Sequence, residues 1–590
     1  MSEADFPDCL GVTSSIRGRR WRLRHDPSAL EEYSTESGLP LLQSALLLGR
    51  DVALSETANF LMPTLRNSLP DPSSLKDADK AAGLILDHII AGKRISLFSD
   101  YDVDGGTSAA QLIRWGRGLG YEFGLYVPDR VKEGYGPSEA AFGQLKAEGV
   151  DLVITLDCGA AAHSALEYAD AIELPVIVVD HHQMGEVPPP ALALVNPNRM
   201  DDTSEQGHLA AAGVTFMLLV ALHREARARD LTNTVDLKSL LGLTALGTVC
   251  DVVPLRGVNR AFVRQGLKVL SSNENIGVQA LADVSSAYPP YTTYHAGFVL
   301  GPRINAGGRI GSAEMGARLL STEDSQQAYG YAAELDRVNL KRRQMQDRIL
   351  EEALEAAQAQ SEEPVIIVAM EDWHPGIIGI VAGRLKDRFR KPAIVIGIDR
   401  DAAEPIAKGS GRSINGVDLG RAISAAEEAG LLLSGGGHAM AGGLSADPDQ
   451  IDAFRTFICE RLAEDVTTAL ENESSKVDYV LSPSSLTDDL MRVIDSVGPY
   501  GAGNPQPVFA FADLSVTYAQ RTKGDHVRFT LSDQDGGNLK GICFRAGESG
   551  LDEALLMAGE QRFHAIGRLK TNVWQGRTSI DFNLMDLAPA

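Results

Sequence analysis

The sequence has no charge-free run of about 20 apolar residues, although 44% of its 590 residues are hydrophobic. A helix needs such a run to cross the hydrocarbon core of a membrane. The N-terminal stretch MSEADFPDCLG also lacks a basic segment followed by an apolar core, the pattern of a secretory signal. We therefore expect a cytoplasmic protein that has no membrane partner.

Cysteine is scarce as well. The five cysteines are scattered and never form a Cys-x-x-Cys pair; they are Cys9, Cys158, Cys250, Cys459 and Cys543. A disulfide framework or a structural zinc site needs regularly spaced thiols. The sequence therefore predicts reduced thiols and neither of these two features.

Positive charge is the third shortage. The chain has 55 Lys and Arg residues against 79 Asp and Glu residues, which gives a formal net charge of −24 at pH 7. A protein that holds nucleic acid with its whole surface is usually basic. An acidic chain can hold a phosphate backbone only where its basic residues are concentrated in a groove or where bound divalent cations add positive charge. The overall charge therefore weighs against a nucleic-acid partner.

Short apolar runs that end in acids or histidines dominate the first third of the chain. Ile95–Phe98 precedes an acidic cluster, Leu152–Leu156 precedes Asp157, and Val176–Val179 precedes the sequence DHH at 180–182. Segments with helical spacing lie between these runs, so the pattern predicts a parallel α/β sheet. Ligands of such sheets gather at the carboxyl ends of the strands, which is where all three polar clusters fall.

The rest of the chain divides into further units. A long polar helical stretch predicts a connector, a second strand–helix pattern follows it, and short β-like runs at the end predict a small barrel or sandwich, with the OB-fold as one candidate. The predicted boundaries are an N-terminal extension (1–75), a first α/β domain (76–322), a connecting helix (323–360), a second α/β domain (361–462), an acidic linker (463–476) and a barrel domain (477–590).

Eight acidic and imidazole side chains come from four separate segments of the first domain. They are Asp100, Asp102, Asp104, Asp157, Asp180, His181, His182 and Asp251. Each segment alone is compatible with a solvated turn or a helix cap. Together they form an oxygen-rich set with one or two imidazoles, which suits Mn²⁺ or Mg²⁺ better than zinc. Several carboxylates around one point also favour a two-metal centre for phosphoryl displacement.

Motifs in the chain resemble those of a known family. SDYDVDGG, TLDCGA, VVDHHQ and GTVCDVVPL resemble, in order, the four signatures of the DHH phosphoesterase superfamily. YVPDRVKEGYG, GPRINAGGRIG, GSGRS, SGGGHAMAGG and GPYGAGNPQPVF narrow the resemblance to the RecJ family of bacterial exonucleases that digest single-stranded DNA from the 5′ end. The resemblance runs from about Leu41 to the C-terminus.

The resemblance implies a role for each residue of the acidic set. Asp102, Asp104, Asp157, His181 and Asp251 match metal-binding positions for two divalent ions, Mn²⁺ or Mg²⁺, and Asp100 is either a further ligand or an outer partner. The implied catalytic residues are Asp157, His181, Asp180 and His182. Asp180 is expected to orient His181, and His182 is expected to face the scissile phosphate.

The resemblance also implies a phosphate-binding set. The second α/β unit resembles the DHHA1 domain, where GSGRS is expected to form an anion cradle from backbone N–H groups, Ser410 and Arg412, with a similar loop at Gly436, Gly437 and His438. Arg130, Arg303, Asn305 and Arg309 lie in motifs that contact DNA phosphates in this family. The alternatives are a simple tight turn for the glycine-rich loops and surface ion pairs for the arginines.

The tail and the basic patch of the connecting helix keep two interpretations each. The tail resembles an OB domain in which Arg528, Lys540, Arg568 and Lys570, with Phe529, Phe544 and Trp574, either contact DNA or, for the aromatics, fill the barrel core. The basic patch 337–348 either lines a DNA channel or is a solvated face. The stretch 17–24 is basic, but nothing nearby assigns it a role.

The resemblance implies a metal-dependent 5′→3′ exonuclease of single-stranded DNA that acts in repair and recombination. It further implies a monomer that works with a helicase and a single-strand-binding protein. One alternative is a phosphodiesterase for short oligonucleotides or cyclic dinucleotides, but those relatives are two-domain proteins without the connector and the barrel-like tail. Another is a non-catalytic Cdc45-like replication scaffold, which predicts lost carboxylates, whereas this chain retains every one.

Overall fold

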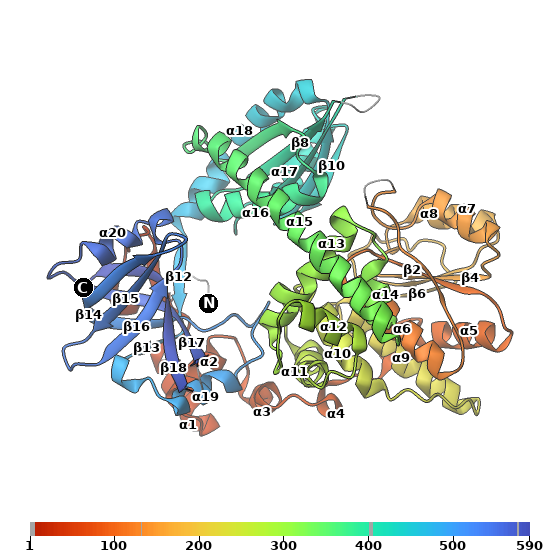
Figure 1. Cartoon of the computed structure of the whole chain (residues 1–590), viewed down its shortest axis with the longest axis horizontal. Helices are drawn as coiled ribbons and strands as arrows, with labels where there is room; N and C mark the ends of the chain where they lie inside the picture. Colours follow the sequence, from red (N-terminus) through yellow and green to blue (C-terminus); the bar gives the residue numbers. More distant parts are fainter. Residues whose placement is uncertain (1–5, 131–132, 401–404, 575–576) are drawn as a thin grey trace.

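The computed structural model describes residues 6–130, 133–400, 405–574 and 577–590. Three modules lie in a triangle: a large α/β module in orange and yellow, a smaller α/β module in green and cyan, and a blue barrel (Figure 1). The predicted fold class is confirmed, with two α/β domains, a long helix between them and a C-terminal barrel. No helix in these described ranges is long and apolar enough to cross a membrane.

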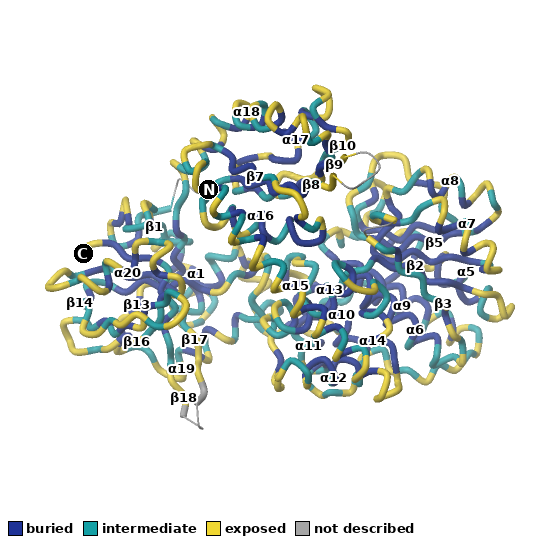
Figure 2. Tube along the Cα trace, turned by 45° about the horizontal axis from the view of Figure 1, so that its top comes forward, coloured by how far each residue is buried: buried dark blue, intermediate teal, exposed yellow. Residues whose placement is uncertain are grey.

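The first module contains a five-stranded parallel sheet of order β3-β2-β4-β5-β6. Its strands are β2 (Ile95–Ser99), β3 (Gly124–Tyr126), β4 (Leu152–Leu156), β5 (Val176–Val179) and β6 (Ala193–Val195). Side chains alternate between the two faces of the sheet, so each strand contributes residues to a hydrophobic core on either side. Figure 2 shows how continuous this buried layer is. The apolar runs that predicted these strands are therefore buried on both faces, as a parallel sheet requires.

Helices cover both faces of this sheet. One core joins the sheet to α5 (Ala78–Ile90), α6 (Val103–Gly118) and α9 (Ala211–Ala228). The opposite core joins it to α7 (Glu139–Ala147) and α8 (His163–Ala171). The carboxyl ends of β2, β4 and β5 consequently meet at one edge, between the two helical layers.

A helical subdomain completes the first module and leads into the connector. It consists of α10 (Leu241–Cys250), α11 (Gly257–Ser271), α12 (Ile276–Val284), the π-helix η6 (His295–Leu300), α13 (Gly301–Ile310) and α14 (Met315–Ser321). The connector α15 (Ser325–Gln358) has 34 residues, about 50 Å of helix, and its N-cap Asp324 accepts the N–H of Gln326 at 2.7 Å.

The second module is a five-stranded sheet of order β10-β11-β9-β8-β7. Its strands are β7 (Ile366–Glu371), β8 (Ala393–Asp399), β9 (Ile406–Arg412), β10 (Ser434–His438) and β11 (Ala441–Ala446), and its helices are α16 (Pro375–Phe389), α17 (Leu419–Glu428) and α18 (Ile451–Glu471). GSGRS and SGGGH therefore belong to strands, which corrects their prediction as loops. A Cβ on Gly411 would lie 2.7 Å from the Leu419 side chain, so these glycines allow close packing inside the sheet.

The C-terminal module is a closed barrel, because β14 pairs with both β15 and β17. Its strands are β13 (Tyr479–Leu481), β14 (Phe509–Thr522), β15 (His526–Ser532), β16 (Asn538–Cys543), β17 (Arg562–Trp574) and β18 (Arg577–Pro589), with helices α19 (Asp488–Ser496) and α20 (Leu551–Leu556). Phe529 is buried in the core, whereas Phe544 is exposed against His526. The side chain of Trp574 lies outside the described residues.

The N-terminal segment belongs to the barrel module. Strand β1 (Arg20–Leu23) pairs in parallel with β12 (Ser474–Val477), and helices α1 (Pro27–Ser37) and α2 (Leu41–Leu48) lie beside the barrel in Figure 1. Trp21 is fully buried, and its Nε1 donates to Asp586 Oδ2 at 3.2 Å. The basic stretch 17–24 therefore has a structural role. The segment 463–476, predicted as a linker, consists mostly of the last turns of α18 and the start of β12.

Each module contacts the other two. Arg309 Nη1 of the first module donates to Gly376 O of the second at 2.9 Å. Arg390 of the second module bonds Glu473 and donates to Arg17 O at 2.9 Å. The buried Arg260 joins the first module to the barrel module, since its Nη2 donates to Val497 O at 2.7 Å. The small helices α3 (Thr57–Leu61) and α4 (Leu65–Ser68) run between the barrel and the first module.

Candidate metal centre and the phosphate-binding cavities beside it

The first acidic cluster is held by the turn between β2 and α6. Asp102 is the N-cap of α6, and its Oδ1 accepts the N–H groups of Asp104 at 2.8 Å and Gly105 at 3.1 Å. A Cβ on Gly105 would lie 2.5 Å from Asp100 O, so only glycine allows this turn to be so tight. The turn places three carboxylates within five residues at the carboxyl edge of the sheet.

Asp104 points into the module and is almost completely buried. Its carboxylate accepts the N–H groups of Ala211 at 2.6 Å and Ala212 at 2.8 Å, at the start of α9. A helix N-terminus favours a negative charge, because its first N–H groups have no partner within the helix. Even so, burial and the adjacent Asp102 raise the pKa of Asp104 to about 7.

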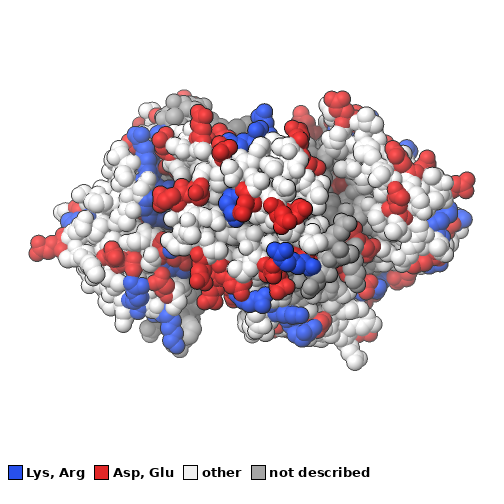
Figure 3. Space-filling view, turned by 90° about the horizontal axis from the view of Figure 1, so that it is seen from above, with Lys and Arg blue, Asp and Glu red and all other residues white. Residues whose placement is uncertain are grey.

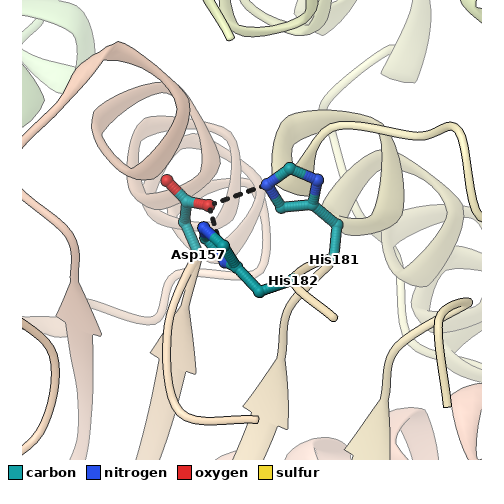
Figure 4. Close-up of side chains that lie close together, drawn as sticks. All are labelled: Asp157, His181 and His182. Atoms are coloured by element: carbon teal, nitrogen blue, oxygen red, sulfur yellow. Dashed lines mark ion pairs between the residues drawn. The ribbon is translucent and has the colours of Figure 1, made fainter. Parts of the chain in front are cut away.

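His181 is the point at which the distant acids meet. Its Nε2 lies 3.3 Å from Asp157 Oδ1, 3.5 Å from Asp251 Oδ2 and 3.8 Å from Asp104 Oδ2. Asp157 follows β4, and Asp251 follows the C-terminus of α10. Figure 4 shows Asp157 facing both His181 and His182, whose Nδ1 lies 3.9 Å from the same oxygen. Acids from three other chain segments thus converge on one imidazole nitrogen.

Asp180 orients His182, which corrects the expectation that it orients His181. Its Oδ1 accepts a hydrogen bond from His182 Nδ1 at 2.8 Å and the backbone N–H of His181 at 2.7 Å. The ring of His181 instead lies beside Asp104, Asp157 and Asp251. Burial opposes ionisation of Asp180, but its bonds to His182 and to the N–H of Ala160 outweigh burial and lower its pKa.

The site is electrostatically unsatisfied without a cation. Burial, reinforced by neighbouring carboxylates, raises the pKa of Asp100 to about 8 and that of Asp251 to about 9, and raises the pKa of Asp157 well above its ordinary value. Burial and the neighbouring His182 lower the pKa of His181 to about 4, so this imidazole is neutral at pH 7. The charge of a divalent cation would allow these acids to ionise together, and the neutral imidazole has a lone pair free to bind it.

Buried polar atoms without partners support this interpretation. Asp100 Oδ1, Asp157 Oδ1, Asp251 Oδ2 and His181 Nε2 have no hydrogen-bond partner among the described residues. Three sets of donor atoms each lie within 4.8 Å of one another: Asp104, His181 and Asp251; Asp157, His181 and His182; Asp100, Asp102 and Asp157. The sets overlap and are rich in oxygen, so the residues fit two adjoining Mn²⁺ or Mg²⁺ ions.

Two cavities beside the centre contain arginine. The first has a volume of about 320 Å³; acids and His182 line it together with Arg130, Asn305 and Arg309. The second has a volume of about 200 Å³ and is lined by Arg130, Arg309 and His374. Arg130 and Arg309 thus belong to both cavities, and Arg130 lies over the ring of Tyr101 at 5.2 Å.

The arginines of the two α/β modules repel one another. Burial lowers the pKa of Arg309 to about 10, and the charges of Arg130, Arg342 and Arg412 contribute to this shift. Burial and Arg130 likewise lower the pKa of Arg412. These four residues are called the arginine cluster below. Such a cluster is stabilised by an anion, just as the acids are stabilised by cations.

Asn305 and Arg303, both predicted to contact phosphates, differ in their surroundings. Asn305 lines the larger cavity, and its Oδ1 accepts the N–H of Val103 at 3.0 Å, at the start of α6. Arg303 does not occur among the described residues that line either cavity. Its Nε donates to Asp336 Oδ1 at 2.8 Å, and its Nη1 donates to Val299 O at 2.8 Å.

The predicted anion cradle of the second module needs correction. Strand β9 pairs with β8 on one side and β11 on the other, so the sheet occupies the backbone N–H groups that were expected to hold an anion. The side chains of Ser410 and Arg412 remain, and Arg412 Nη1 donates to Ser410 Oγ at 3.3 Å. Gly436, Gly437 and His438 lie in the edge strand β10.

Two residues of the site were not singled out from the sequence. The hydroxyl of Tyr135 donates to Asp157 O at 3.2 Å and lies 3.3 Å from His182 Nε2. It belongs to the motif YVPDRVKEGYG, which was the available signal. Arg342 lies buried within the basic patch 337–348, whereas Arg337 of the same patch forms a surface pair with Glu334. The patch is therefore solvated at Arg337, and its role as the lining of a DNA channel stays a prediction.

On the face that Figure 3 shows, Asp and Glu side chains outnumber Lys and Arg side chains. Asp and Glu side chains are spread over the whole of this face, and Lys and Arg form small groups among them. The chain therefore presents no continuous basic coat there, in agreement with its net charge of −24.

Comparisons with known proteins agree with this architecture. Three family models match the chain: the DHH family, N-terminal domain, at residues 94–248, the DHHA1 domain at 362–464, and the RecJ OB domain at 477–586. The single-stranded-DNA-specific exonuclease RecJ of Bacillus subtilis (strain 168) is 33% identical over 581 residues, 96% of this chain and 71% of that protein. RecJ of Escherichia coli (strain K12) is 32% identical over 571 residues, 93% of this chain and 96% of that protein.

A solved structure gives the same result. The crystal structure of RecJ from Thermus thermophilus in complex with Mn²⁺ matches with a TM-score of 0.78 at 29% identity and covers 96% of this chain and 79% of that one. The matches extend through both α/β modules and the barrel, in the same order along the chain. The chain therefore belongs to the RecJ family of the DHH phosphoesterases.

Proposed function

We propose that the chain is a metal-dependent exonuclease that hydrolyses single-stranded DNA from its 5′ end to 5′-mononucleotides, in DNA repair and recombination. One observation carries the proposal: acids of the metal-binding type and two residues of the arginine cluster, Arg130 and Arg309, line the same 320 Å³ cavity. A phosphodiester group in that cavity satisfies both, because its oxygens bind divalent cations and guanidinium groups alike.

The proposed roles follow from the geometry. Asp102, Asp104, Asp157, His181 and Asp251 hold two cations, and Asp100, whose Oδ1 is buried without a partner among the described residues, holds one of them or a bound water. Bound Mn²⁺ or Mg²⁺ would polarise the phosphodiester and make an attacking water more acidic. Burial disfavours a charged His182, but Asp180 and nearby carboxylates raise its pKa, so a proton stays close to the phosphate oxygens. Tyr135 holds the ring of His182 from the other side.

The arginine cluster would position the strand. Arg130 and Arg309 face the cavity that contains the acids, and Arg412 with Ser410 approaches from the second module. We propose that Arg412 and Ser410 bind the terminal 5′-phosphate, with Gly436, Gly437 and His438 at the exposed edge beside them. The barrel, which the smaller phosphodiesterases lack, favours a polymeric substrate. The retained carboxylates do not favour a scaffold role. Asn305 would help to position the start of α6, because its Oδ1 accepts the N–H of Val103. Arg303 would act indirectly, through its ion pair with Asp336.

The predicted helicase and single-strand-binding partners, the monomeric state and the cytoplasmic location remain part of this proposal. The resemblance to RecJ supports them.

Digestion of single strands labelled at either end, with a duplex control, tests the proposal in the presence of Mn²⁺, Mg²⁺ or EDTA. We expect labelled mononucleotide from the 5′ label at once and from the 3′ label only at the end, with no release in EDTA. Preferential release from the 3′ end, equal digestion of duplex or activity in EDTA would contradict the direction, the strand preference or the metal dependence, respectively.

A further inference from the structure

Two aromatic rings stand exposed on the first module. Tyr294 and Phe298 have relative exposures of 61% and 67%, and their rings are stacked with centroids 5.5 Å apart and planes 25° apart. Exposed aromatic side chains that lie side by side keep apolar surface in water, and such patches typically mark a binding site. The two rings present a stacked, flat apolar surface.

Tyr294 and Phe298 lie on a segment that packs next to the candidate metal centre. They flank the start of the π-helix η6, a geometry that is frequent at functional sites. Between them, Ala296 O accepts a contact from Cys250 Sγ at 3.4 Å, and a Cβ on Gly297 would lie 3.6 Å from Val249 Cγ1. Cys250 lines the larger cavity and directly precedes the candidate ligand Asp251. The η6 backbone therefore abuts the wall of the catalytic cavity.

The same segment continues toward the arginine cluster. Helix α13 begins directly after η6 and carries Asn305 and Arg309, which line the cavity. The segment that carries the two rings therefore packs against one cavity residue, Cys250, and leads along the chain to two others, Asn305 and Arg309.

The barrel reaches this position from the other side. Lys570 of β17 has its Nζ 6.0 Å from the centre of the Tyr294 ring. Thr293 Oγ1 donates to Tyr500 O at 2.7 Å, in the loop that leads into β14. The rings therefore lie at the junction of the first module and the barrel, with a basic side chain over one of them.

We infer that Tyr294 and Phe298 form a stacking platform for the bases of single-stranded DNA that leave the catalytic cavity toward the barrel, with Lys570 beside the backbone. This inference rests on the proposed function. Bases stack on aromatic side chains irrespective of sequence, and a neighbouring cation attracts the phosphates. A base can reach the platform only when it is unpaired, so the platform favours single strands over duplex.

The test uses the full chain with Asp157→Ala, which prevents cleavage, and measures the binding of a fluorescent oligothymidylate of about 20 nucleotides, long enough to span the cavity and the barrel. We expect Tyr294→Leu with Phe298→Leu to weaken binding about tenfold or more, since the leucines keep apolar surface but remove both rings. Tyr294→Phe with Phe298→Tyr keeps both rings and should bind like the parent. Tyr329→Leu is the matched control, an exposed aromatic of α15 whose hydroxyl donates to Asp283.

An abasic strand of the same length separates stacking from other contacts. We expect the parent and the double leucine variant to bind this strand equally, because it has phosphates but no bases at the platform. An unchanged affinity of the leucine variant for oligothymidylate would overturn the platform. An equal loss on the abasic strand would overturn it too, because the rings would then act on the backbone or on the fold. If the wild-type chain neither binds nor cleaves single strands, the proposed function fails instead.

Discussion

The metal-binding acids and the arginine cluster are opposite in charge and alike in design. Asp100, Asp104 and Asp157 are buried beside the half-buried Asp251, and the pKa values of all four are raised. Arg309 and Arg412 are half-buried near other arginines, and their pKa values are lowered. In both groups, the fold keeps side chains of the same charge close together, although these charges repel one another. The two halves meet in one cavity, which Arg130 and Arg309 share with the acids.

The difference lies in how each half is supported. Backbone N–H groups and a helix N-terminus hold Asp104, and the carboxylate of Asp102 caps α6, so the acids are fixed by secondary structure. The arginines come from two modules and the connecting helix, so their arrangement depends on how the modules are joined. A net charge of −24 is therefore compatible with a DNA substrate, since the positive charge needs to be concentrated only at this junction.

Removing the central acid, Asp157, should have the largest effect and should act on the metal-binding group alone. We expect Asp157→Ala to lower the rate of nucleotide release more than about 1,000-fold, because it removes an oxygen that all of the proposed chemistry shares. Single-strand binding, measured by fluorescence anisotropy, should persist or strengthen, because a negative charge is lost. Asp170→Ala, an exposed acid of α8, is the control. Equal activity in the Asp157 variant would contradict the two-metal assignment.

Removing one arginine should test the other half. We expect Arg309→Ala to lower kcat/KM on single strands about 10- to 100-fold and to reduce the salt dependence of binding by about one phosphate contact. Arg318→Ala on the neighbouring helix α14 is the control, because Arg318 pairs with Glu314 at the surface and is not among the described residues that line either cavity. A similar effect of the two substitutions would mean that Arg309 acts only through the fold.

Arg412 should have a narrower effect. We expect Arg412→Ala to abolish most of the preference for a strand with a 5′-phosphate over one with a 5′-hydroxyl, while activity on the hydroxyl strand changes only a few-fold. Paired digestion assays of the two strands measure this ratio. An unchanged preference would show that the terminal phosphate binds elsewhere.

The smallest expected effect is on stability. The pKa values of Asp104, Asp100 and Asp251 are about 7, 8 and 9 in the fold and near 3.9 in an unfolded chain. The metal-free fold therefore binds more protons than the unfolded chain above about pH 4, and its stability should fall as the pH rises toward about 9. Calorimetry in EDTA should show a lower Tm for the first α/β module near pH 9 than near pH 6, by about 2–4 °C for each kcal/mol lost in a unit of roughly 250 residues.

Added Mn²⁺ should reverse this trend, because cations take the place of the protons. Asp251→Asn should flatten the decline in EDTA. A Tm that rises with pH in the absence of metal would contradict the raised pKa values.

The sequence predicted the acidic half well, because local patterns encode it. Apolar runs that end in acids identify strand tips, and parallel strands bring their tips together whatever the loops do. The support of Asp104 was not predictable, since its partners Ala211 and Ala212 lie more than 100 residues away and contribute only backbone atoms. Asp180 was assigned to the wrong ring, because either adjacent histidine could face it.

The sequence was less informative about the second sheet and the chain ends. Glycine-rich segments usually indicate turns, whereas GSGRS and SGGGH form strands whose glycines make room for side chains such as Leu419. The N-terminal extension has no motif that indicates its partner, because parallel pairing of β1 with β12 depends on residues some 450 positions away. Long-range pairing of this kind has no local signature.

The packing of Trp21 against the barrel has a consequence for the synthesis of the chain. Trp21 is buried against Asp586, 565 residues later, so its segment stays uncovered until the barrel has been made. At about 5–20 residues per second, that interval lasts roughly half a minute to two minutes. During this time, β1 lacks its partner β12 and Leu46 of α2 lacks the barrel core that covers it, while both α/β modules can already fold. The segment around β1 is therefore covered only after the barrel has been synthesised, and it needs protection throughout this interval.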